Sequence, residues 1–196
     1  MSSPGLRERK KAKTRRTIQE HALRLFAEQG YDATTVDQIA EASEISPSTF
    51  FRYFATKEDV VIDDDYDPML IRAFVEQPLS LSPVAAFRAA MHTAFDEIYD
   101  TEGSQIFQRT KLQLEHPAIR ARVLNNQYNN TLNAIALAAA ERYGRDVNDL
   151  EIQVFAGALI GAMYPALARW VASDGKAALP ELIDASLAQL DSGLPL

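Results

Sequence analysis

The chain has 196 residues, of which 47% are hydrophobic and 24% are charged. This length and apolar fraction are enough to bury one large core or two small ones. The complete lack of cysteine excludes disulfide bonds, a thiolate nucleophile and cysteine-ligated metals, and it suits a reducing cytosol.

The formal net charge of −7 hides an asymmetry along the chain. Residues 1–16 hold seven basic residues and one acidic residue, a local charge of +6, whereas the remaining residues hold 13 basic and 26 acidic ones. A basic segment on an acidic body is typical of a localised contact with a polyanion. A solvated, disordered N-terminus is the alternative, and composition alone does not decide between the two interpretations.

Apolar periodicity predicts a first helix that Gly30 can end, with a face made of Ile18, Ala22, Leu25 and Phe26. Residues 35–38, T-V-D-Q, have the form of a capping box and predict the start of a second helix. Ser46 and Pro47 predict the N-cap and first position of a third, because the missing N–H of proline costs nothing there. Thr56 is the expected cap of a fourth.

Further along, residues 82–83, Ser-Pro, predict the start of a helix with one side made of Phe87, Met91, Phe95 and Ile98. Gly103 and Gly144 are expected to interrupt the middle of the chain. A last amphipathic helix is expected over residues 179–190. Because no run of alternating β-branched residues is long enough to predict a sheet, the predicted fold class is all-α.

Residues 152–172 form an apolar run. Signals for the start of a helix precede it at residues 148–151, and a signal for a helix end follows it at Gly175. The run is nearly long enough to span a bilayer, but it contains Gln153, Pro165 and Arg169. We therefore expect a buried core or subunit-interface helix and no membrane association. The N-terminus has no apolar segment that could serve as a signal peptide, so a cytoplasmic protein is expected.

Residues 35–43 and 47–54 are two short helices joined by a tight connection, which is the size of a helix-turn-helix. The second helix of such a motif lies in a major groove and needs one anchored face and one polar face. Phe50 and Phe54 are the expected anchors, helped by Phe51. The groups left facing outward can all form hydrogen bonds: Ser48, Thr49, Arg52 and Tyr53.

Lys57 stands in the first turn of the fourth predicted helix, where a cation opposes the helix dipole. A phosphate held between its ammonium and the free N–H groups of the turn would reverse that penalty. A solvated lysine is the alternative.

The sequence A-L-R-L-F-A-E-Q-G-Y-D-A-T-T-V-D-Q-I-A-E-A-S-E-I-S-P-S-T-F-F-R-Y-F-A-T-K-E-D-V, residues 22–60, resembles the DNA-binding domain of TetR-type transcriptional regulators. The resemblance is nearly continuous, runs without gaps and includes every element of the motif. It implies an N-terminal three-helix DNA-binding domain with a helix-turn-helix, followed by a C-terminal helical ligand-binding and dimerisation domain. It also implies a homodimer that usually acts as a repressor on a palindromic operator.

Family roles carried to matching positions make four residues expected phosphate contacts: Thr34, Thr35, Tyr53 and Lys57. They place another four where the recognition helix meets DNA: Ser46, Ser48, Thr49 and Arg52. From the basic segment, Arg15 and Arg16 complete the expected DNA-contact set. Phe51 stands where the family usually has a tyrosine whose hydroxyl touches a phosphate, and Ser48 replaces a common glycine.

The expected domains are a basic disordered arm over residues 1–11, the DNA-binding domain over 12–60 with its helix-turn-helix at 35–54, and the helical body over 61–196. Pro68 should kink or break the helix that links the two domains. Four aspartates lie within residues 61–68, and a solvated acidic helix edge is favoured over a cation site because a glycine turn and the required spacing are lacking.

Neither a metal site nor a catalytic site is predicted. The three histidines, His21, His92 and His116, lack paired-ligand spacing. No serine, histidine and acid combination stands out as catalytic. We therefore expect no metal, no cofactor and no enzymatic activity.

Aromatic and methionine side chains of the body should mostly form ordinary core, and a subset could line an elongated apolar pocket. The candidate pocket residues are Phe95, Tyr99, Phe107, Arg109, Tyr128, Asn129, Phe155 and Met163. The segments K-E-D-V-V-I-D-D-D, L-Q-L-E-H-P-A-I-R-A-R-V and A-L-A-R-W-V-A are loosely similar to TetR-type regulators with an acyl-CoA-like ligand-binding domain. That similarity implies a small apolar effector of fatty acyl or acyl-CoA-like chemistry.

Small residues on the apolar run and leucines on the last helix predict an isologous four-helix dimer interface. The candidates are Gly157, Gly161, Tyr164, Leu182, Leu187 and Leu190. Tight packing within one subunit is the alternative.

The sequence thus predicts a homodimeric repressor that a small effector releases from its operator. Two alternatives stay open: a regulator of the same fold that needs no small molecule or that activates, and a helical acyl-binding enzyme.

Overall fold

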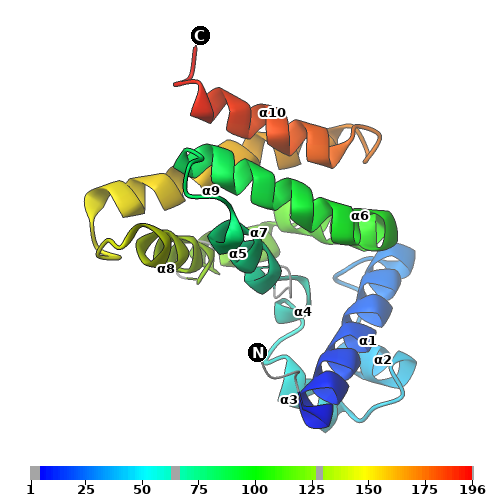
Figure 1. Cartoon of the computed structure of the whole chain (residues 1–196). Helices are drawn as coiled ribbons and strands as arrows, with labels where there is room; N and C mark the ends of the chain where they lie inside the picture. Colours follow the sequence, from blue (N-terminus) through cyan, green and yellow to red (C-terminus); the bar gives the residue numbers. More distant parts are fainter. Residues whose placement is uncertain (1–4, 63–66, 127–129, 196) are drawn as a thin grey trace. The chain divides into compact units, whose positions relative to one another are not determined.

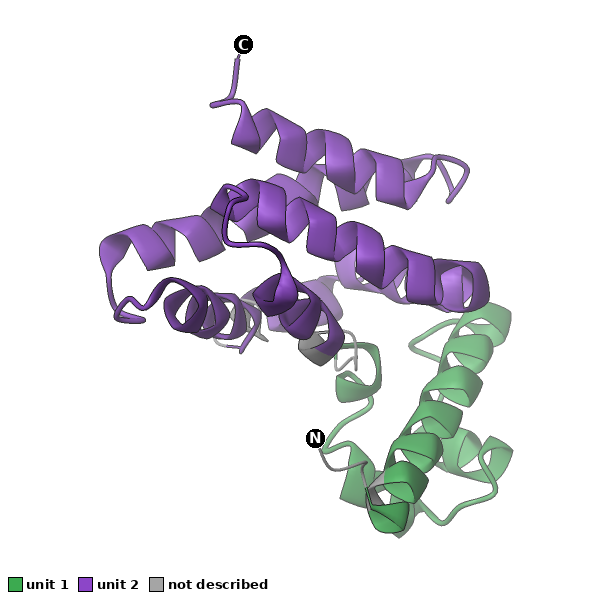
Figure 2. Ribbon diagram, viewed as in Figure 1, with its two compact units in different colours: residues 1–63 green, residues 64–196 purple. Residues whose placement is uncertain are grey.

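The computed structural model describes residues 5–62, 67–126 and 130–195. These residues form helices α1 to α10 with no strand among them, which confirms the all-α prediction (Figure 1). The chain divides into two compact units, residues 1–63 and residues 64–196, which we call unit 1 and unit 2 (Figure 2).

Unit 1 contains α1 (Leu6–Gln29), α2 (Val36–Ala42), α3 (Pro47–Tyr53) and the short α4 (Asp59–Ile62). Helix α1 starts at Leu6, so the expected disordered arm over residues 1–11 is corrected for residues 6–11. Between Leu6 and Gln29 the sequence has no glycine or proline and is rich in lysine, arginine, alanine and leucine, which are strong helix formers. Residues 1–4 lie outside the described part.

Local signals set the helix ends of unit 1 as expected. Gly30 ends α1 with φ +89°, and its N–H donates to the carbonyl of Phe26 at 3.1 Å. Thr35 and Gln38 form the predicted capping box of α2, and Ser46 caps α3 with Pro47 at its first position. The buried residues of α1 are Ile18, Ala22, Leu23 and Phe26, with Leu25 only half-buried.

Unit 2 contains α5 (Asp67–Glu76), α6 (Pro83–Glu115), α7 (Pro117–Asn126), α8 (Leu132–Tyr143), α9 (Leu150–Ala172) and α10 (Leu179–Asp191). Pro68 lies in the first turn of α5, where proline is tolerated. Gly144 ends α8 in the left-handed conformation, with φ +62°. By contrast, α6 runs through Gly103, so the expected interruption there is wrong. A single glycine costs a helix about 1 kcal/mol, too little to stop one of 33 residues.

The core of unit 2 forms where α9 packs against α8 and α10, and α6 packs against α5 and α10. Much of this core is alanine, which lets helix axes approach closely, together with large side chains such as Phe74, Phe87 and Trp170. The face of α9 that carries Ile152, Ala156 and Leu159 is buried there. Among the described helices α9 is long and apolar enough to cross a membrane, and this packing accounts for its apolar character on that face.

A polar network joins α6 to α10. Arg88 donates two hydrogen bonds of 3.0 Å to the carboxylate of Asp184, and His92 Nε2 lies 3.0 Å from the same group. Ser82 Oγ donates to Asp191 at 2.8 Å. Burial raises the pKa of Asp184, but the hydrogen bonds from Arg88 and His92 outweigh it and hold that pKa below its ordinary value.

Candidate nucleic-acid interface

Helix α3 is anchored by two phenylalanines. Phe50 and Phe54 are buried, and their ring centroids lie 5.8 Å apart. Phe51 was expected to help them, but 53% of it is exposed and it contacts Phe50 edge-on. The physical reason is helical spacing: residues at i and i+4 share a face, whereas residue i+1 points about 100° away.

After Pro47, which is also exposed, the exposed side of α3 is formed by Ser48, Phe51 and Arg52, at i, i+3 and i+4. Thr49 and Tyr53 are half-buried at the borders of that side. The guanidinium carbon of Arg52 lies 5.6 Å from the centre of the Tyr53 ring. We call Ser48, Phe51 and Arg52 the reading face.

Three hydroxyls at the start of α3 are joined in one network. Ser46 Oγ accepts from the backbone N–H of Thr49 at 3.1 Å, and it lies 2.9 Å from Ser48 Oγ and 3.0 Å from Thr49 Oγ1. These hydrogen bonds fix the orientation of the three hydroxyls relative to one another. Each hydroxyl can donate once and accept twice, so capacity for another partner remains.

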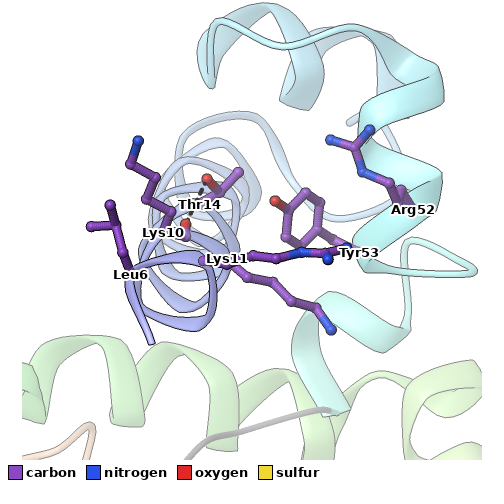
Figure 3. Close-up of a pocket in the computed structure, with 7 residues that line it drawn as sticks. Leu6, Lys10, Lys11, Thr14, Arg52 and Tyr53 are labelled. Atoms are coloured by element: carbon purple, nitrogen blue, oxygen red, sulfur yellow. Dashed lines mark hydrogen bonds between the residues drawn. The ribbon is translucent and has the colours of Figure 1, made fainter. Parts of the chain in front are cut away.

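The N-terminal turns of α1 and the end of α3 line one groove, shown in Figure 3. Its lining residues are Leu6, Arg7, Lys10, Lys11, Thr14, Arg52 and Tyr53. Three of these, Arg7, Lys10 and Lys11, are cations that the sequence analysis did not assign to the interface individually. On α1, Arg7, Lys10, Lys11 and Thr14 stand at i, i+3, i+4 and i+7. This spacing predicts a shared face once residues 6–11 are taken as helical.

The other two expected cations differ in their surroundings. The guanidinium of Arg15 lies 4.8 Å from the centre of the buried Phe54 ring, a cation–π contact that holds α1 to α3. Arg16 is exposed.

Thr34 and Thr35 have different positions. Thr34 is 1% exposed, its hydroxyl donates to the carbonyl of Gly30 at 2.8 Å, and it accepts from Gln29 at 3.1 Å. Its side chain is therefore inside unit 1, which corrects its expected place on the DNA-facing surface. Thr35 is exposed and caps α2.

Lys57 is held by the turn that follows α1. Its Nζ donates to the carbonyls of Tyr31 at 2.8 Å and of Thr34 at 2.9 Å, and it lies 4.1 Å from the centre of the Tyr31 ring. An ammonium has three donors, so two are used internally. The sequence showed the cation but could not show these carbonyls, because they lie 23 and 26 residues away.

In unit 2, the expected pocket residues fall into separate groups. Phe107 lies 5.2 Å and Tyr99 lies 6.4 Å from Trp170 between ring centroids, and Phe95 contacts Tyr99 at 5.9 Å. Phe155 instead stacks on Phe74 at 6.0 Å. Since Phe155 and Trp170 are 15 residues apart on α9, the two groups are separated by about 22 Å along that helix.

Met163 is half-buried against the core, and Arg109 is buried. Tyr128 and Asn129 lie outside the described residues. Trp170, which was not among the expected pocket residues, is 2% exposed, and its indole N–H has no hydrogen-bond partner among the described residues.

The expected dimer residues are also divided. Gly161 and Tyr164 are exposed, and Cβ atoms placed on Gly157 and Gly161 would meet nothing within 4 Å. They continue an exposed apolar stripe of α9 that begins with Leu150 and Val154. Leu182 and Leu190 pack partly against the core. Leu187 is fully buried in unit 2, so it cannot contact a partner, which corrects its expected place.

The aspartates at 63–65 lie outside the described residues. Within the described ranges, there is no group of three or more histidine, aspartate or glutamate side chains that could hold a metal ion.

Comparisons with known proteins agree with this architecture. Residues 18–63 match the family model described as bacterial regulatory proteins, tetR family, and residues 81–195 match the MftR C-terminal domain. The HTH-type transcriptional regulator TcmR of Streptomyces glaucescens is 34% identical over 180 residues, which cover 88% of this chain and 77% of TcmR.

Two solved structures share the fold. FadR of Thermus thermophilus, a TetR family transcriptional repressor in complex with lauroyl-CoA, has a TM-score of 0.56 and 22% identity over 93% of this chain and 95% of its own. FadR of Bacillus subtilis, in complex with stearoyl-CoA, has a TM-score of 0.60 and 21% identity over 91% and 98%. The family and the curated relative are regulators and not enzymes. The chain therefore belongs to the tetR family of bacterial transcriptional regulators, with an MftR-type C-terminal domain.

Proposed function

We propose that the chain is a cytoplasmic homodimeric repressor that binds a palindromic operator and leaves it when a small apolar effector of fatty acyl or acyl-CoA-like chemistry binds unit 2. The reading face beside the basic groove is the observation that carries this proposal. Helix-turn-helix dimers place two such faces in successive major grooves, about 34 Å apart.

The residues of unit 1 divide into two roles in this proposal. Arg52 and Ser48, exposed on α3, contact base edges, because a guanidinium can bind a guanine with two hydrogen bonds. The groove cations Arg7, Lys10 and Lys11 contact phosphates. Thr35, Tyr53 and the third donor of Lys57 add backbone contacts, which orient the helix without reading sequence.

The dimer and the effector have support of different kinds. The exposed apolar stripe of α9, with Gly157 and Gly161 at its middle, suits the close approach of a second copy. The two FadR structures with acyl-CoA ligands motivate the effector class. In unit 2, we place the effector beside the packed aromatic group of Phe95, Tyr99, Phe107 and Trp170, where the phenol O–H and the indole N–H are donors.

Release would follow from a two-state coupling. An effector that prefers one conformation of unit 2 changes the separation of the reading faces, and such couplings are typically about 1–3 kcal/mol.

Operator binding measured by fluorescence anisotropy tests the proposal, with DNA from upstream of the protein's own gene and with DNA chosen by unbiased selection. We expect a dimer to bind, long-chain acyl-CoA to weaken binding by roughly 5- to 150-fold, and Arg52→Ala to lose preference for operator over random DNA. Arg24→Ala, which removes an exposed cation paired with Glu28 on α1, is the matched control.

Each part of the proposal can fail separately. Tight binding that ignores acyl-CoA would favour a regulator without this effector, and transcription that rises with operator occupancy would favour an activator. Replacing Lys10 and Lys11 by glutamine should weaken binding to all sequences equally and flatten its salt dependence.

A further inference from the structure

Phe51 is an exposed apolar side chain that stands on the reading face beside two groups that can form hydrogen bonds. It is 53% exposed, and it shares the reading face with Ser48 and Arg52. Its ring meets the ring of Phe50 at 5.5 Å between centroids and an interplanar angle of 88°. Because Phe50 is fully buried, this contact limits the orientations of the Phe51 ring.

The chemistry of the major groove restricts what such a ring can recognise. Phenylalanine cannot form a side-chain hydrogen bond with a phosphate or with a base edge. The apolar group that a base pair presents in the major groove is the C5-methyl of thymine, and phenylalanine is among the side chains that contact it.

We propose that Phe51 selects a thymine in each operator half-site through the C5-methyl group. The inference rests on the proposed function, since it requires α3 to lie in the major groove. Phe51 is then a specificity-determining residue, and its place between Ser48 and Arg52 adds an apolar element to a face that otherwise reads hydrogen-bonding groups.

Insertion of the ring between base pairs is the competing use of an exposed phenylalanine. Such wedges belong to proteins that bind the minor groove and kink the duplex. A helix-turn-helix places its second helix in the major groove, and the contact with Phe50 ties the ring to the body of unit 1. Methyl recognition therefore suits the geometry better.

Deoxyuridine tests the proposal, because it differs from thymidine only by the missing methyl group. After selection of a high-affinity operator with the wild-type protein, each thymine of one half-site is replaced in turn, and affinity is measured by anisotropy. We expect one position where the replacement weakens binding about fourfold, equivalent to about 0.8 kcal/mol for one buried methyl group. Replacing the symmetry-related thymine as well should weaken binding about 15-fold.

A double-mutant cycle assigns the effect to the ring. Phe51→Ala should bind the thymine operator with the affinity that wild type has for the doubly substituted one, and deoxyuridine should cost it nothing further. Phe51→Leu should keep part of the discrimination. Ser48→Ala, on the same face, is the matched control and should keep the full effect of deoxyuridine. Circular dichroism verifies that each variant is folded, which we expect because both side chains are exposed.

Two results would overturn the inference while leaving the proposed function intact. One is an equal cost of deoxyuridine in wild type and Phe51→Ala. The other is operator binding in which no thymine is sensitive to deoxyuridine, with Phe51→Ala weakening binding to all sequences, as expected of a backbone contact or a wedge. Failure of the wild type to select any DNA would instead reject the proposed function, and this inference with it.

Discussion

The two units differ in how far apart in sequence their connecting residues lie. In unit 1 the long-range hydrogen bonds join residues 23 to 41 positions apart, from Lys57 to Tyr31 and Thr34 and from Gln19 to Val60, while Gln29 bonds Gln38 only nine positions away. In unit 2 they join residues 64 to 109 positions apart, from Arg142 to the end of α5 and from Ser82 to Asp191. The hydrogen bonds that hold unit 1 together therefore join residues closer in sequence than those that hold unit 2 together.

A single cation illustrates the difference in each unit. Lys57 fastens one turn with two carbonyls of nearby sequence. Arg142, on α8, donates to two carbonyls in the last turn of α5, those of Phe74 and Val75, and to two just after it, those of Gln77 and Pro78, at distances of 2.6 to 3.2 Å. The carbonyls at a helix C-terminus lack partners within the helix, and a planar guanidinium can serve several of them at once.

Phe50→Ala should have the largest effect, because it removes the buried anchor of the unit built from near neighbours. The loss should be about 3–5 kcal/mol. Thermal unfolding followed by circular dichroism should show a new early transition from unit 1 with unit 2 unchanged. Phe51→Ala, at the next and exposed position, is the control and should cost about 0.5 kcal/mol or less. One transition that shifts as a whole would mean that the two units unfold together.

Arg142→Met should have an intermediate effect and should act on unit 2. Methionine keeps much of the apolar stem but none of the donors, so the carbonyls at the end of α5 lose their partner at a cost of about 2 kcal/mol. Urea unfolding measures this loss. Arg145→Met is the control, since Arg145 is exposed and its partners Asp149 and Glu151 are close in sequence. If both variants lose the same free energy of unfolding, the long-range hydrogen bonds of Arg142 stabilise unit 2 no more than the local ion pairs of Arg145 do.

Asp184→Asn should have the smallest effect, about 1 kcal/mol, because the pair of Asp184 and Arg88 is partly exposed. The folded pKa of Asp184 lies below its ordinary value of 3.8, so the carboxylate stabilises unit 2 above that value. This contribution is lost as the pH falls through the lower folded pKa. The stability difference between wild type and Asp184→Asn should therefore shrink on acidification; a difference that grows would contradict the pairing.

Local pattern was sufficient for the fold class, for most helix ends and for the exposure of Ser48 and Arg52 on α3, but it placed Phe51 among the anchors, and the structure exposes it. The capping box at Thr35, the cap at Ser46 and the glycine ends at Gly30 and Gly144 each depend on residues within one turn of the helix end. The burial of Phe50 and Phe54 and the exposure of Arg52 follow from helical spacing.

Other features depend on which elements meet in the folded chain. The burial of Thr34 and Leu187, the carbonyl partners of Lys57 and Arg142, and the separation of Phe155 from Trp170 all involve segments that lie far apart in sequence. Periodicity shows that a side chain faces inward or outward, but not what it meets there. The start of α1 is a local feature that charge concealed, because the described side chains of its first two turns are exposed and belong to helix formers. The continuation of α6 through Gly103 is different, because the packing of a long helix outweighs the small local cost of one glycine.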